Sequence, residues 1–406
     1  MKIYFLLLIA GWAGLALADD TCNRNIDDDV LKAIVSFQTK LCKLVANFNR
    51  NRFVISPYGV YLELAAMGEG ATGDSQKEIF TALQLPEEKC LRDKYYEYIR
   101  DAELQIPKLT SFNSYFGSRF LAIDEGYNVN GTWAEDVRKH GLLDYVSLPL
   151  KRDPGAAFEK LNLITFNPLA GQNLNLQGNS LIDAANYHVT WQTEFPLNKI
   201  EYDAKFYSER GQEIATVNLM RYKKRVKMAF LEKYFAKALA LPIGEDGRYY
   251  MVFMLNIGYN LLEQTIYRMD DDIVNDIIDN LKQSKIPIDI AIPEFTAKSS
   301  DVSLKSILED MGVKKLWSEP EASELVSNPP TVPTTFYQQV QLHIGSRGLS
   351  QYFEEESDGG DSGLEEVLTD EFIANRPFLY ALIDSKTKIC IFSGGYGGPD
   401  SKYEHF

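Results

Sequence analysis

The feature that most constrains this chain is an acidic segment that directly precedes two strongly apolar runs. Between Glu354 and Glu371 the sequence holds nine acidic residues and no Lys or Arg. Such a segment buries too little apolar surface to order itself, so we expect it to stay solvated. The runs Pro377–Ile383 and Ile389–Phe392 are predicted to be buried strands, joined by a turn at Asp384–Thr387. The pattern therefore predicts an exposed acidic loop between a globular body and a C-terminal hairpin.

Residues 1–18 have the pattern of a secretory signal peptide. Lys2 supplies the positive start, the run from Phe5 to Ala18 is almost wholly apolar, and Ala16-Leu17-Ala18 is a small-x-small cleavage pattern. The apolar run is short for a membrane anchor, and no other stretch is long enough to span a bilayer. The mature chain, residues 19–406, is therefore expected to be secreted into the extracellular space.

Composition limits the class of partner. The chain is 45% hydrophobic and 24% charged, which is ordinary for a globular protein, and its net charge is −15. Because nine of the negative charges lie in the one loop, the body is only mildly acidic. This balance argues against nucleic acid and against anionic membrane surfaces as partners.

Four cysteines and one sequon bear on the compartment. In an oxidising compartment the cysteines allow three full pairings, and their spacing fits no zinc pattern. Cys390 lies in an apolar strand pattern and is expected to be a buried free thiol, whereas Cys22 with Cys90 is the disulfide that we favour. Asn130 begins the only glycosylation sequon, which predicts an exposed modified site in a secreted chain.

Hydrophobic periodicity predicts helices first and mostly strands afterwards, which favours one large α+β domain. The unbroken apolar run Tyr249–Leu255 is typical of a strand that is buried on both faces. The helices expected from pattern and capping are residues 27–41, 58–67, 74–85, 133–140, 270–281 and 304–311. The strands expected are residues 53–55, 111–123, 180–191, 223–230, 237–242, 249–255 and 286–295.

Motifs in the same order along the chain resemble those of the serpin family. Each motif alone is weak, but together they span residues 30 to 400 and are highly specific. They are Asn51–Pro57 (NFVFSP-like), Ala65–Leu85 (GAxGxTxxEIxxxL-like), Trp191–Phe195 (WxxxF), Asp289–Phe295 (VxLPKF-like), Leu304–Gly312 (LKxxLxxLG-like), and Pro377–Leu379 with Pro399 (PFLFxI…P).

The resemblance implies a fold and a mechanism. The fold would be a large central mixed β-sheet with two further sheets, about nine helices and an exposed reactive loop, here residues 346–376. In the family a protease cleaves this loop, and the freed segment inserts as a new strand of the central sheet. The protease is carried along and trapped as a distorted acyl-enzyme. Inhibition therefore needs a hinge that enters the sheet quickly.

The hinge departs from the pattern of the inhibitors, which have Thr and then a run of Ala after a Gly. Gly348 matches, but Leu349 stands in place of Thr, and bulky or acidic residues replace the alanines. Since inserted residues alternate faces, either register buries at least two carboxylates, and unpaired buried charges are costly. We therefore predict that the loop inserts more slowly than the acyl bond is hydrolysed, so that the protease is released. The predicted hinge is Arg347, Gly348, Leu349, Ser350, Gln351, Tyr352 and Phe353.

The sheet-opening cluster and the loop composition also differ from the pattern of the family's inhibitors. The family opens its sheet at a Ser, Asn and His cluster, for which this chain has Ser56, Asp183 and Gln338. The loop holds no Lys or Arg between Gly348 and Asn375, so trypsin-like proteases have no site there. Counting from either end gives a candidate scissile region of Ser362, Gly363, Leu364, Glu365 and Glu366.

Charged and aromatic clusters have competing interpretations. One basic run holds Arg221, Lys223, Lys224, Arg225 and Lys227. Lys223, Arg225 and Lys227 alternate, so they could line one strand face and bind a glycosaminoglycan or another polyanion; the run could also balance nearby acids or hold the acidic loop. Asp270–Asp272 fits a helix start better than a metal site. The histidines have no ligand spacing, and no nucleophile elbow is present. Abundant Tyr and Phe indicate a core rather than a carrier pocket.

The sequence thus favours a secreted, non-inhibitory serpin-like monomer that acts by binding, as a decoy, a carrier or a regulator of extracellular proteolysis. The alternative is a serine protease inhibitor that traps non-trypsin-like enzymes by loop cleavage. Storage is a third interpretation, for which composition shows no bias. The expected partner is an extracellular serine protease or another protein. No catalytic activity, metal or cofactor is expected.

Overall fold

The computed structural model describes residues 22–49, 52–104, 114–165, 178–244, 247–299, 304–319, 324–325, 330–350 and 370–399. The predicted signal peptide lies outside these residues. None of the helices within them is long and apolar enough to cross a membrane.

The described residues form nine α-helices and seventeen strands, joined in part by short 3-10 turns. The helices are α2 (Asp27–Phe48), α3 (Pro57–Glu69), α4 (Gly73–Leu83), α5 (Lys89–Leu104), α6 (Gly131–Lys139), α7 (Pro154–Ile164), α8 (Leu262–Arg268), α9 (Ile273–Asn280) and α10 (Lys305–Asp310). The strands are β1 (Phe53–Ile55), β2 (Ser114–Asp124), β3 (Asp144–Leu148), β4 (Ser180–Thr190), β5 (Ile200–Tyr207), β6 (Glu213–Lys224), β7 (Lys227–Leu231), β8 (Ala236–Ile243), β9 (Tyr249–Asn256), β10 (Lys282–Gln283), β11 (Ile288–Pro293), β12 (Phe295–Lys298), β13 (Thr335–Ile344), β14 (Gly348–Ser350), β15 (Asp370–Ile373), β16 (Phe378–Asp384) and β17 (Cys390–Tyr396).

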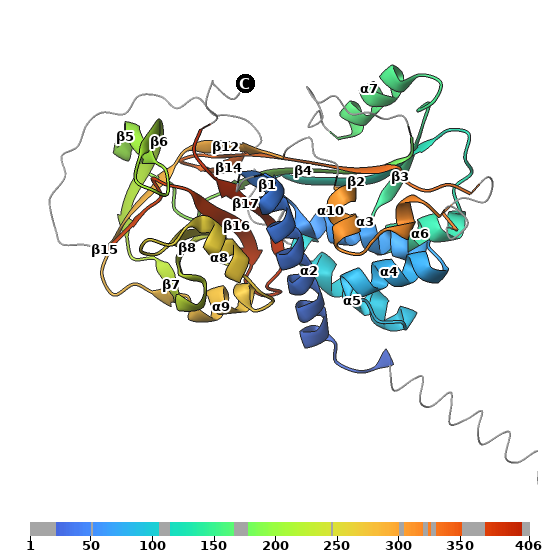
Figure 1. The fold of residues 1–406 in the computed structure, drawn as a ribbon, viewed down its shortest axis with the longest axis horizontal. Coiled ribbons are helices and arrows are strands. Elements are labelled where there is room, and N and C mark those ends of the chain that lie inside the picture. Colours follow the sequence, from blue (N-terminus) through green and yellow to red (C-terminus); the bar gives the residue numbers. More distant parts are fainter. Residues whose placement is uncertain are drawn as a thin grey trace, which may run out of the picture.

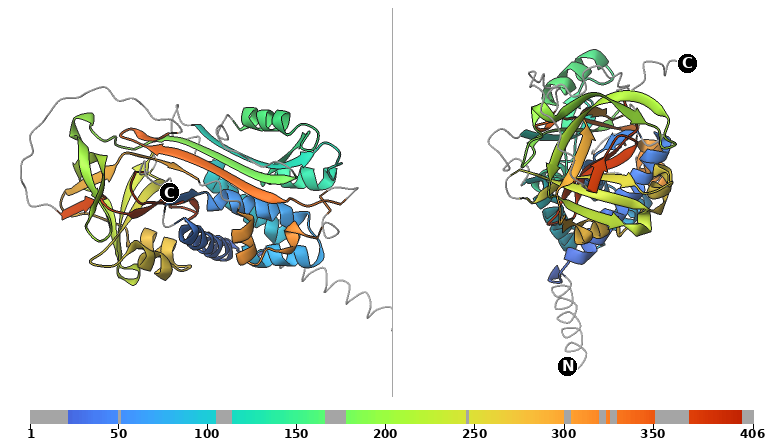
Figure 2. Two further views of the ribbon diagram at one scale, coloured as in Figure 1. Left: turned by 45° about the horizontal axis from the view of Figure 1, so that its top comes forward. Right: turned by 90° about the vertical axis from the view of Figure 1, so that its left-hand side faces the viewer.

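Three sheets organise the molecule (Figure 1). A long mixed sheet has the order β12-β13-β14-β4-β2-β3, an antiparallel sheet has the order β1-β17-β16-β9-β8-β7-β10, and a small sheet has the order β15-β11-β6-β5. The mixed sheet runs along the length of the molecule, with α7 on one side and α3, α4 and α6 on the other (Figure 2). This is the architecture that the resemblance implied.

Helix α3 lies at the centre of the core. Its first turn is fixed by Ser56, whose Oγ accepts a hydrogen bond from the amide of Gly59 at 3.2 Å, and by Pro57 at the first helical position. Every residue from Pro57 to Gly68 is buried, so the helix is not amphipathic and must be covered all round. It contacts the mixed sheet through β2 and β4 and the antiparallel sheet through β17.

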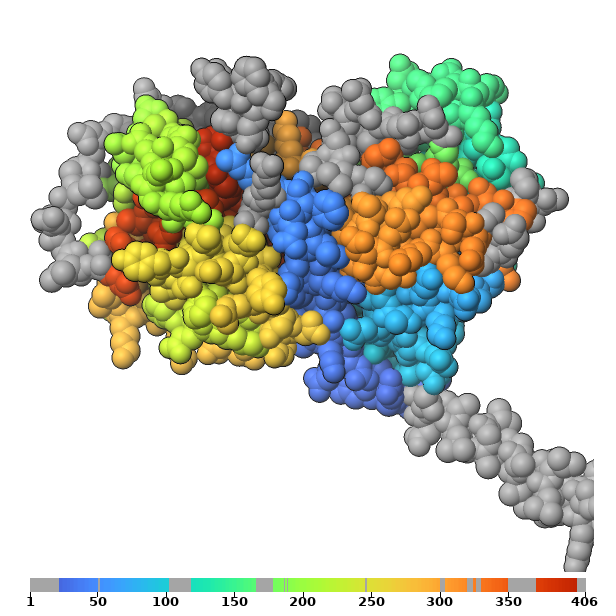
Figure 3. All heavy atoms as spheres, in the orientation of Figure 1, coloured from blue at the N-terminus to red at the C-terminus, as the bar shows by residue number. Residues whose placement is uncertain are grey.

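Helix α2 covers a different edge of the core. Its apolar stripe packs against α3 and β17, while its other face is open to solvent. In the space-filling view it runs between the segment that carries α8 and α9 and the segment that carries α10 (Figure 3). Many aromatic residues lie in the core, as predicted, since the largest fully buried side chains are Tyr and Phe.

One predicted strand was wrong. Residues 223–230 do not form one strand, because β6 ends at Lys224 and β7 begins at Lys227, and the two strands belong to different sheets. The prediction failed because the basic residues on either side of this turn alternate as they would along one face of a strand. The sequence prediction also lacked the short or polar elements β3, β5, α5, α7 and α8, and the ten-residue strand β13, which is mostly buried although three of its residues are Gln.

The boundaries predicted for the exposed loop were also too wide. Of residues 346–376, Ser346, Gly348 and Leu349 are buried, and β14 joins the mixed sheet. At the other end, β15 pairs in parallel with β11 in the small sheet. The loop is thus held by a strand at each end, and residues 351–369 between them lie outside the described residues.

A disulfide joins Cys22 to Cys90, which is the pairing that we favoured, with Cα atoms 5.8 Å apart. Cys42 and Cys390 are free and buried. The bridge ties the start of the described chain to α5 across a sequence separation of 68 residues.

We expect the double change Cys22→Ser/Cys90→Ser to lower the free energy of unfolding by up to about 4 kcal/mol, because a loop of this length loses that much entropy when it is closed in the unfolded chain. Urea unfolding of the variant, compared with oxidised wild-type protein, measures the loss, and reduced wild-type protein should resemble the variant. Equal stability of oxidised wild-type protein and the variant would contradict this expectation.

Candidate functional site

The hinge begins inside the mixed sheet. Strand β14 is wedged between β13 and β4, with Leu349 opposite Ile344 on one side and opposite Val189 on the other. The Leu349 side chain is only 1% exposed. Of the predicted hinge residues, Arg347, Gly348, Leu349 and Ser350 lie in or next to this strand. Gln351, Tyr352 and Phe353, and the scissile candidates 362–366, lie outside the described residues.

Residues that follow β4 form hydrogen bonds with the turn that leads into the hinge. The turn is closed by two backbone hydrogen bonds between Gly345 and Gly348, at 2.9 and 3.3 Å. Trp191 donates its ring Nε1–H to the Gly345 carbonyl and its amide to the Arg347 carbonyl, both at 2.9 Å. Phe195 donates its amide to the Ser346 carbonyl at 2.9 Å. The WxxxF motif is therefore a clamp on the hinge.

Gly348 is required by this packing. Its φ of +155° is a conformation that L side chains rarely adopt, and a Cβ atom here would lie 2.1 Å from the carbonyl oxygen of Val189. The backbones of β14 and β4 thus approach each other in a way that only glycine allows.

Beyond β14 the mixed sheet is closed. Strands β13 and β4 pair directly in parallel, from Thr335 opposite Ser180 to Gln341 opposite Asn186. We call this stretch the seam. An inserting loop would have to separate it, so the residues that join its two strands control whether insertion can start.

The predicted sheet-opening cluster lies on the seam. Gln338 donates its amide to Asp183 Oδ2 at 2.7 Å and to the Ser56 carbonyl at 2.8 Å, and its Oε1 accepts from the Ser56 amide at 2.9 Å. The structure thus brings all three predicted residues together, and all are buried. Asp183 is 1% exposed and fits closely over α3, since a Cβ on Gly59 would lie 1.9 Å from its Oδ2.

A fourth member, Glu63, was missed. Its carboxylate is fully buried and has no hydrogen-bond partner within the described part of the chain. Burial and the nearby charge of Asp183 raise the pKa of Glu63 well above its ordinary value, and Arg119 only partly opposes them. The signal for this residue was its place inside the apolar run from Tyr58 to Met67, where a carboxylate is out of place.

The basic residues do not share one strand face. Arg221 lies on β6 and bonds to Glu201 at 2.6 Å and to Asp289 at 3.4 Å, so its charge is already balanced. Lys223 and Lys224 end β6, Arg225 lies in the turn, and Lys227 begins β7. The prediction of an alternating face was wrong, because the chain passes from one sheet to another here.

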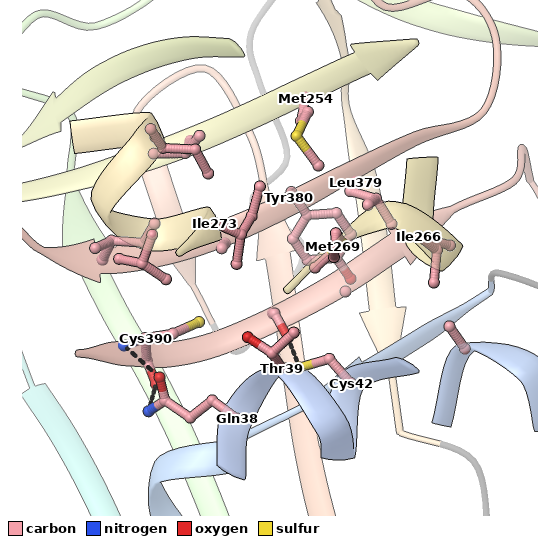
Figure 4. Close-up of a pocket in the computed structure, with 18 of the residues that line it drawn as sticks. Gln38, Thr39, Cys42, Met254, Ile266, Met269, Ile273, Leu379, Tyr380 and Cys390 are labelled. Atoms are coloured by element: carbon pink, nitrogen blue, oxygen red, sulfur yellow. Dashed lines mark hydrogen bonds between the residues drawn. The ribbon is translucent and has the colours of Figure 1, made fainter. Parts of the chain in front are cut away.

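An apolar cavity of about 80 Å³ lies between α2, the helices α8 and α9, and the antiparallel sheet (Figure 4). Burial raises the pKa of the Cys42 thiol at its wall to about 11, although the Ser393 hydroxyl at 2.9 Å works in the opposite direction. The volume is well below the roughly 300 Å³ at which small-molecule sites begin. As it stands, this cavity fits only a very small apolar ligand.

Other candidates have structural roles. Asn130 caps α6 through its Oδ1 and donates its Nδ2 to the Glu324 carbonyl at 3.1 Å, while staying partly exposed. Asp270 and Asp272 bind Lys233 just before α9, at 2.7 and 3.3 Å. Within the described part of the chain, no group of acidic, His or Cys residues has the arrangement of a metal site.

We expect Gly348→Ala to displace β14 from the mixed sheet and to lower the free energy of unfolding by about 1–3 kcal/mol, because the new Cβ clashes with Val189. Hydrogen exchange of the Leu349 and Trp191 amides should accelerate. Gly131→Ala is the matched control, since a Cβ there meets nothing within 4 Å. Unchanged protection in both variants would show that the hinge is not seated as described.

We expect Glu63→Gln to stabilise the protein more as pH rises. The folded state holds the Glu63 proton more tightly than the unfolded chain, so wild-type stability falls as pH rises from about 4.5 through the raised pKa. The glutamine removes that loss. Unfolding free energies at about pH 4 and pH 8 measure the effect. A difference between variant and wild type that does not change with pH would contradict it.

Comparison with known proteins agrees with this geometry. The chain matches the family model described as Serpin (serine protease inhibitor) over residues 32–399. Serpin B5 of Xenopus tropicalis is 21% identical over 386 residues, which cover 89% of this chain and 94% of that protein. A thyroxine-binding globulin complex with thyroxine has a TM-score of 0.79 at 15% identity, covering 92% of this chain and all of that chain. Mouse protein-Z dependent protease inhibitor has a TM-score of 0.77 at 18% identity, covering 92% and 98%. Because the family model covers most of its length, the chain belongs to the serpin superfamily.

Proposed function

We propose that this protein is a secreted serpin that does not trap proteases efficiently and acts by binding, as a decoy, a carrier or a regulator of extracellular proteolysis. It has no catalytic role in this proposal. Its partner would be an extracellular serine protease or another protein. Secretion rests on the pattern of residues 1–18, and the loss of trapping rests on the hinge and the seam.

The register of β14 carries the proposal. Leu349 lies opposite Val189 on β4 and Ile344 on β13, and β14 is antiparallel to both strands. Each residue further along β14 therefore lies opposite a residue one position earlier in β4 and in β13. If the loop continued into the sheet in this register, Glu355 would oppose Asp183 on one side and Gln338 on the other. It would also share the inward face with Leu349, because residues at even spacing share a face.

Insertion would therefore bring a third carboxyl group into a buried site that already holds Asp183 and Glu63. It would also break the hydrogen bond between Gln338 and Asp183 in a dry environment. Leaving a buried hydrogen-bonding group unsatisfied costs about 1–3 kcal/mol, and more when the group is charged, and directly opposed like charges add to that. A penalty of only about 1.4 kcal/mol on the barrier slows insertion tenfold.

A protease inhibitor with a target outside the trypsin-like class remains the second candidate. Its support is the seating of the hinge, since β14 already occupies the entrance to the seam. A carrier of a hormone-sized ligand has less support, because the apolar cavity of about 80 Å³ would have to widen several-fold.

Loop cleavage tests the proposal. We expect cleavage by an elastase-like protease to leave the melting temperature unchanged and to give no SDS-resistant adduct, because insertion would place the Glu355 carboxyl group opposite Asp183. The double variant Asp183→Asn/Glu355→Ala removes the two opposed charges, so its cleaved form should melt at a clearly higher temperature. Glu356→Ala is a control for loss of loop charge, because a residue at odd spacing from Leu349 would face away from the core in this register.

Each outcome separates the two candidates. A sharp rise in melting temperature together with an adduct in the wild-type protein would establish an inhibitor and overturn the proposal. A rise in the double variant alone would support the carboxylates as the barrier. No rise in either protein would leave the non-inhibitory role standing but assign the barrier to the bulky hinge residues.

A further inference from the structure

Two carboxyl groups share one dry site beneath the seam. Gly59 and Glu63 are four residues apart on α3, so they lie on the same face of the helix. Gly59 lies against the side chain of Asp183, since a Cβ there would be 1.9 Å from Asp183 Oδ2. Glu63 is fully buried and close enough to Asp183 to feel its charge, and neither of its oxygens has a hydrogen-bond partner among the described residues. The helix thus places a second carboxyl group next to the one that closes the seam.

A single cation acts on this site from the described elements around it. Arg119 on β2 lies directly opposite Asp183 on β4, and Gln338 on β13 lies directly opposite Asp183 on the other side. The Arg119 guanidinium also donates to two backbone carbonyls that follow α6, at 3.0 and 3.1 Å, so it is held in place. The other described elements that pack on α3, which are α2, α4, α6 and β17, bring no charged group that acts on Glu63.

The site therefore balances one negative charge, and the hydrogen bonds decide which carboxyl group carries it. Asp183 accepts the Gln338 amide at 2.7 Å and lies opposite Arg119, and both contacts favour its ionised form. Glu63 accepts no hydrogen bond from a described residue, and a second buried negative charge would lack a counter-ion. Glu63 is thus the group that holds a proton while the seam is closed. Burial and the charge of Asp183 raise the pKa of Glu63 well above its ordinary value, in agreement with this assignment.

Opening of the seam removes the reason to hold that proton. Separation of β13 from β4 takes the Gln338 amide away from Asp183 and lets water reach the face of α3 that carries Glu63. A hydrated glutamic acid ionises above about pH 4.5. Between that pH and the raised pKa of Glu63, the open seam therefore binds about one proton fewer than the closed seam. The stabilisation of the closed seam is complete in mild acid and is lost as pH rises through this range.

We propose that Glu63 makes the seam a proton-controlled lock, which mild acid keeps closed and a rise in pH releases. Because one proton leaves when the two strands separate, each pH unit should shift the opening equilibrium by up to about tenfold. Any strand that enters the mixed sheet must first separate the seam. Acidic surroundings would therefore hold the protein in its closed form, and neutral surroundings would make the sheet receptive. The lock does not depend on the partner of the protein or on its secretion.

The proton itself is tested by infrared spectroscopy of the uncleaved protein. At about pH 7 an ordinary carboxyl group is ionised, so only a carboxyl group with a strongly raised pKa gives the carbonyl band of a protonated acid. We expect the wild-type protein to show this band and Glu63→Gln to lack it. Glu69→Gln is the matched control on the same helix, because Glu69 is buried but bound by Arg92 at 2.6 Å. This control should keep the band. Absence of the band from wild-type protein, or a band of equal size in Glu63→Gln, would overturn the proposal.

Hydrogen exchange tests whether the proton controls opening. Amides of residues 181–185 and 337–341 are followed in wild-type protein and in Glu63→Gln, which imitates the protonated form. Comparison at equal pH cancels the intrinsic chemistry of exchange. The opening constant of the wild-type seam, relative to that of the variant, should rise by up to about tenfold per pH unit between about pH 5 and pH 7. These exchange rates should depend only weakly on urea, because local opening exposes little surface.

Asp183→Asn tests the origin of the pH dependence. The asparagine keeps an acceptor for Gln338 but removes the negative charge, so Glu63 can ionise beside Arg119 in the closed seam, and the pH dependence should disappear. Glu69→Gln should keep the wild-type pH dependence. Equal opening constants in wild-type protein and Glu63→Gln at every pH would refute the lock, as would a steep urea dependence, which would assign the proton to global unfolding. Since the loop stays intact in these measurements, their failure would leave the loop-cleavage result untouched.

Discussion

The contact that closes the mixed sheet below the hinge is the hydrogen bond between Gln338 and Asp183 across the seam. It joins β13 to β4 beneath the hinge, and Gln338 also holds the start of α3 through both groups of the Ser56 peptide backbone. Three structural units therefore meet at one buried amide. Because breaking a hydrogen bond to a buried carboxylate is costly, the seam resists separation at this level.

The hinge and the seam act against each other. The clamp by Trp191 and Phe195 seats β14 at the entrance of the sheet, as a strand about to insert would be seated. The next residues that would enter are bulky or acidic, and the register directs Glu355 to the level of Asp183. The fold thus keeps the machinery for insertion, while its sequence places charge at the point where insertion needs small apolar residues.

The two ends of the acidic loop lie near different chemistry. At its start, the hinge meets a buried acidic environment, with Asp183 and Glu63 under the seam. At its end, β15 joins the small sheet, where β6 ends in Lys223 and Lys224. The two ends of the loop are therefore anchored in different sheets and beside side chains of opposite charge.

The sequence by itself determined the family, the α+β class, the buried helix α3, the C-terminal hairpin and the identities of Ser56, Asp183 and Gln338, because these depend on local pattern and on motif order. Only the tertiary structure decided which of those residues touch, that Glu63 lies beneath them with no hydrogen-bond partner among the described residues, and that Leu349 is already in the sheet. It also separated Lys223 from Lys227, because β6 and β7 belong to different sheets. The physical reason is that burial, register and charge pairing arise from contacts between segments far apart in the chain, which the period of one segment cannot encode.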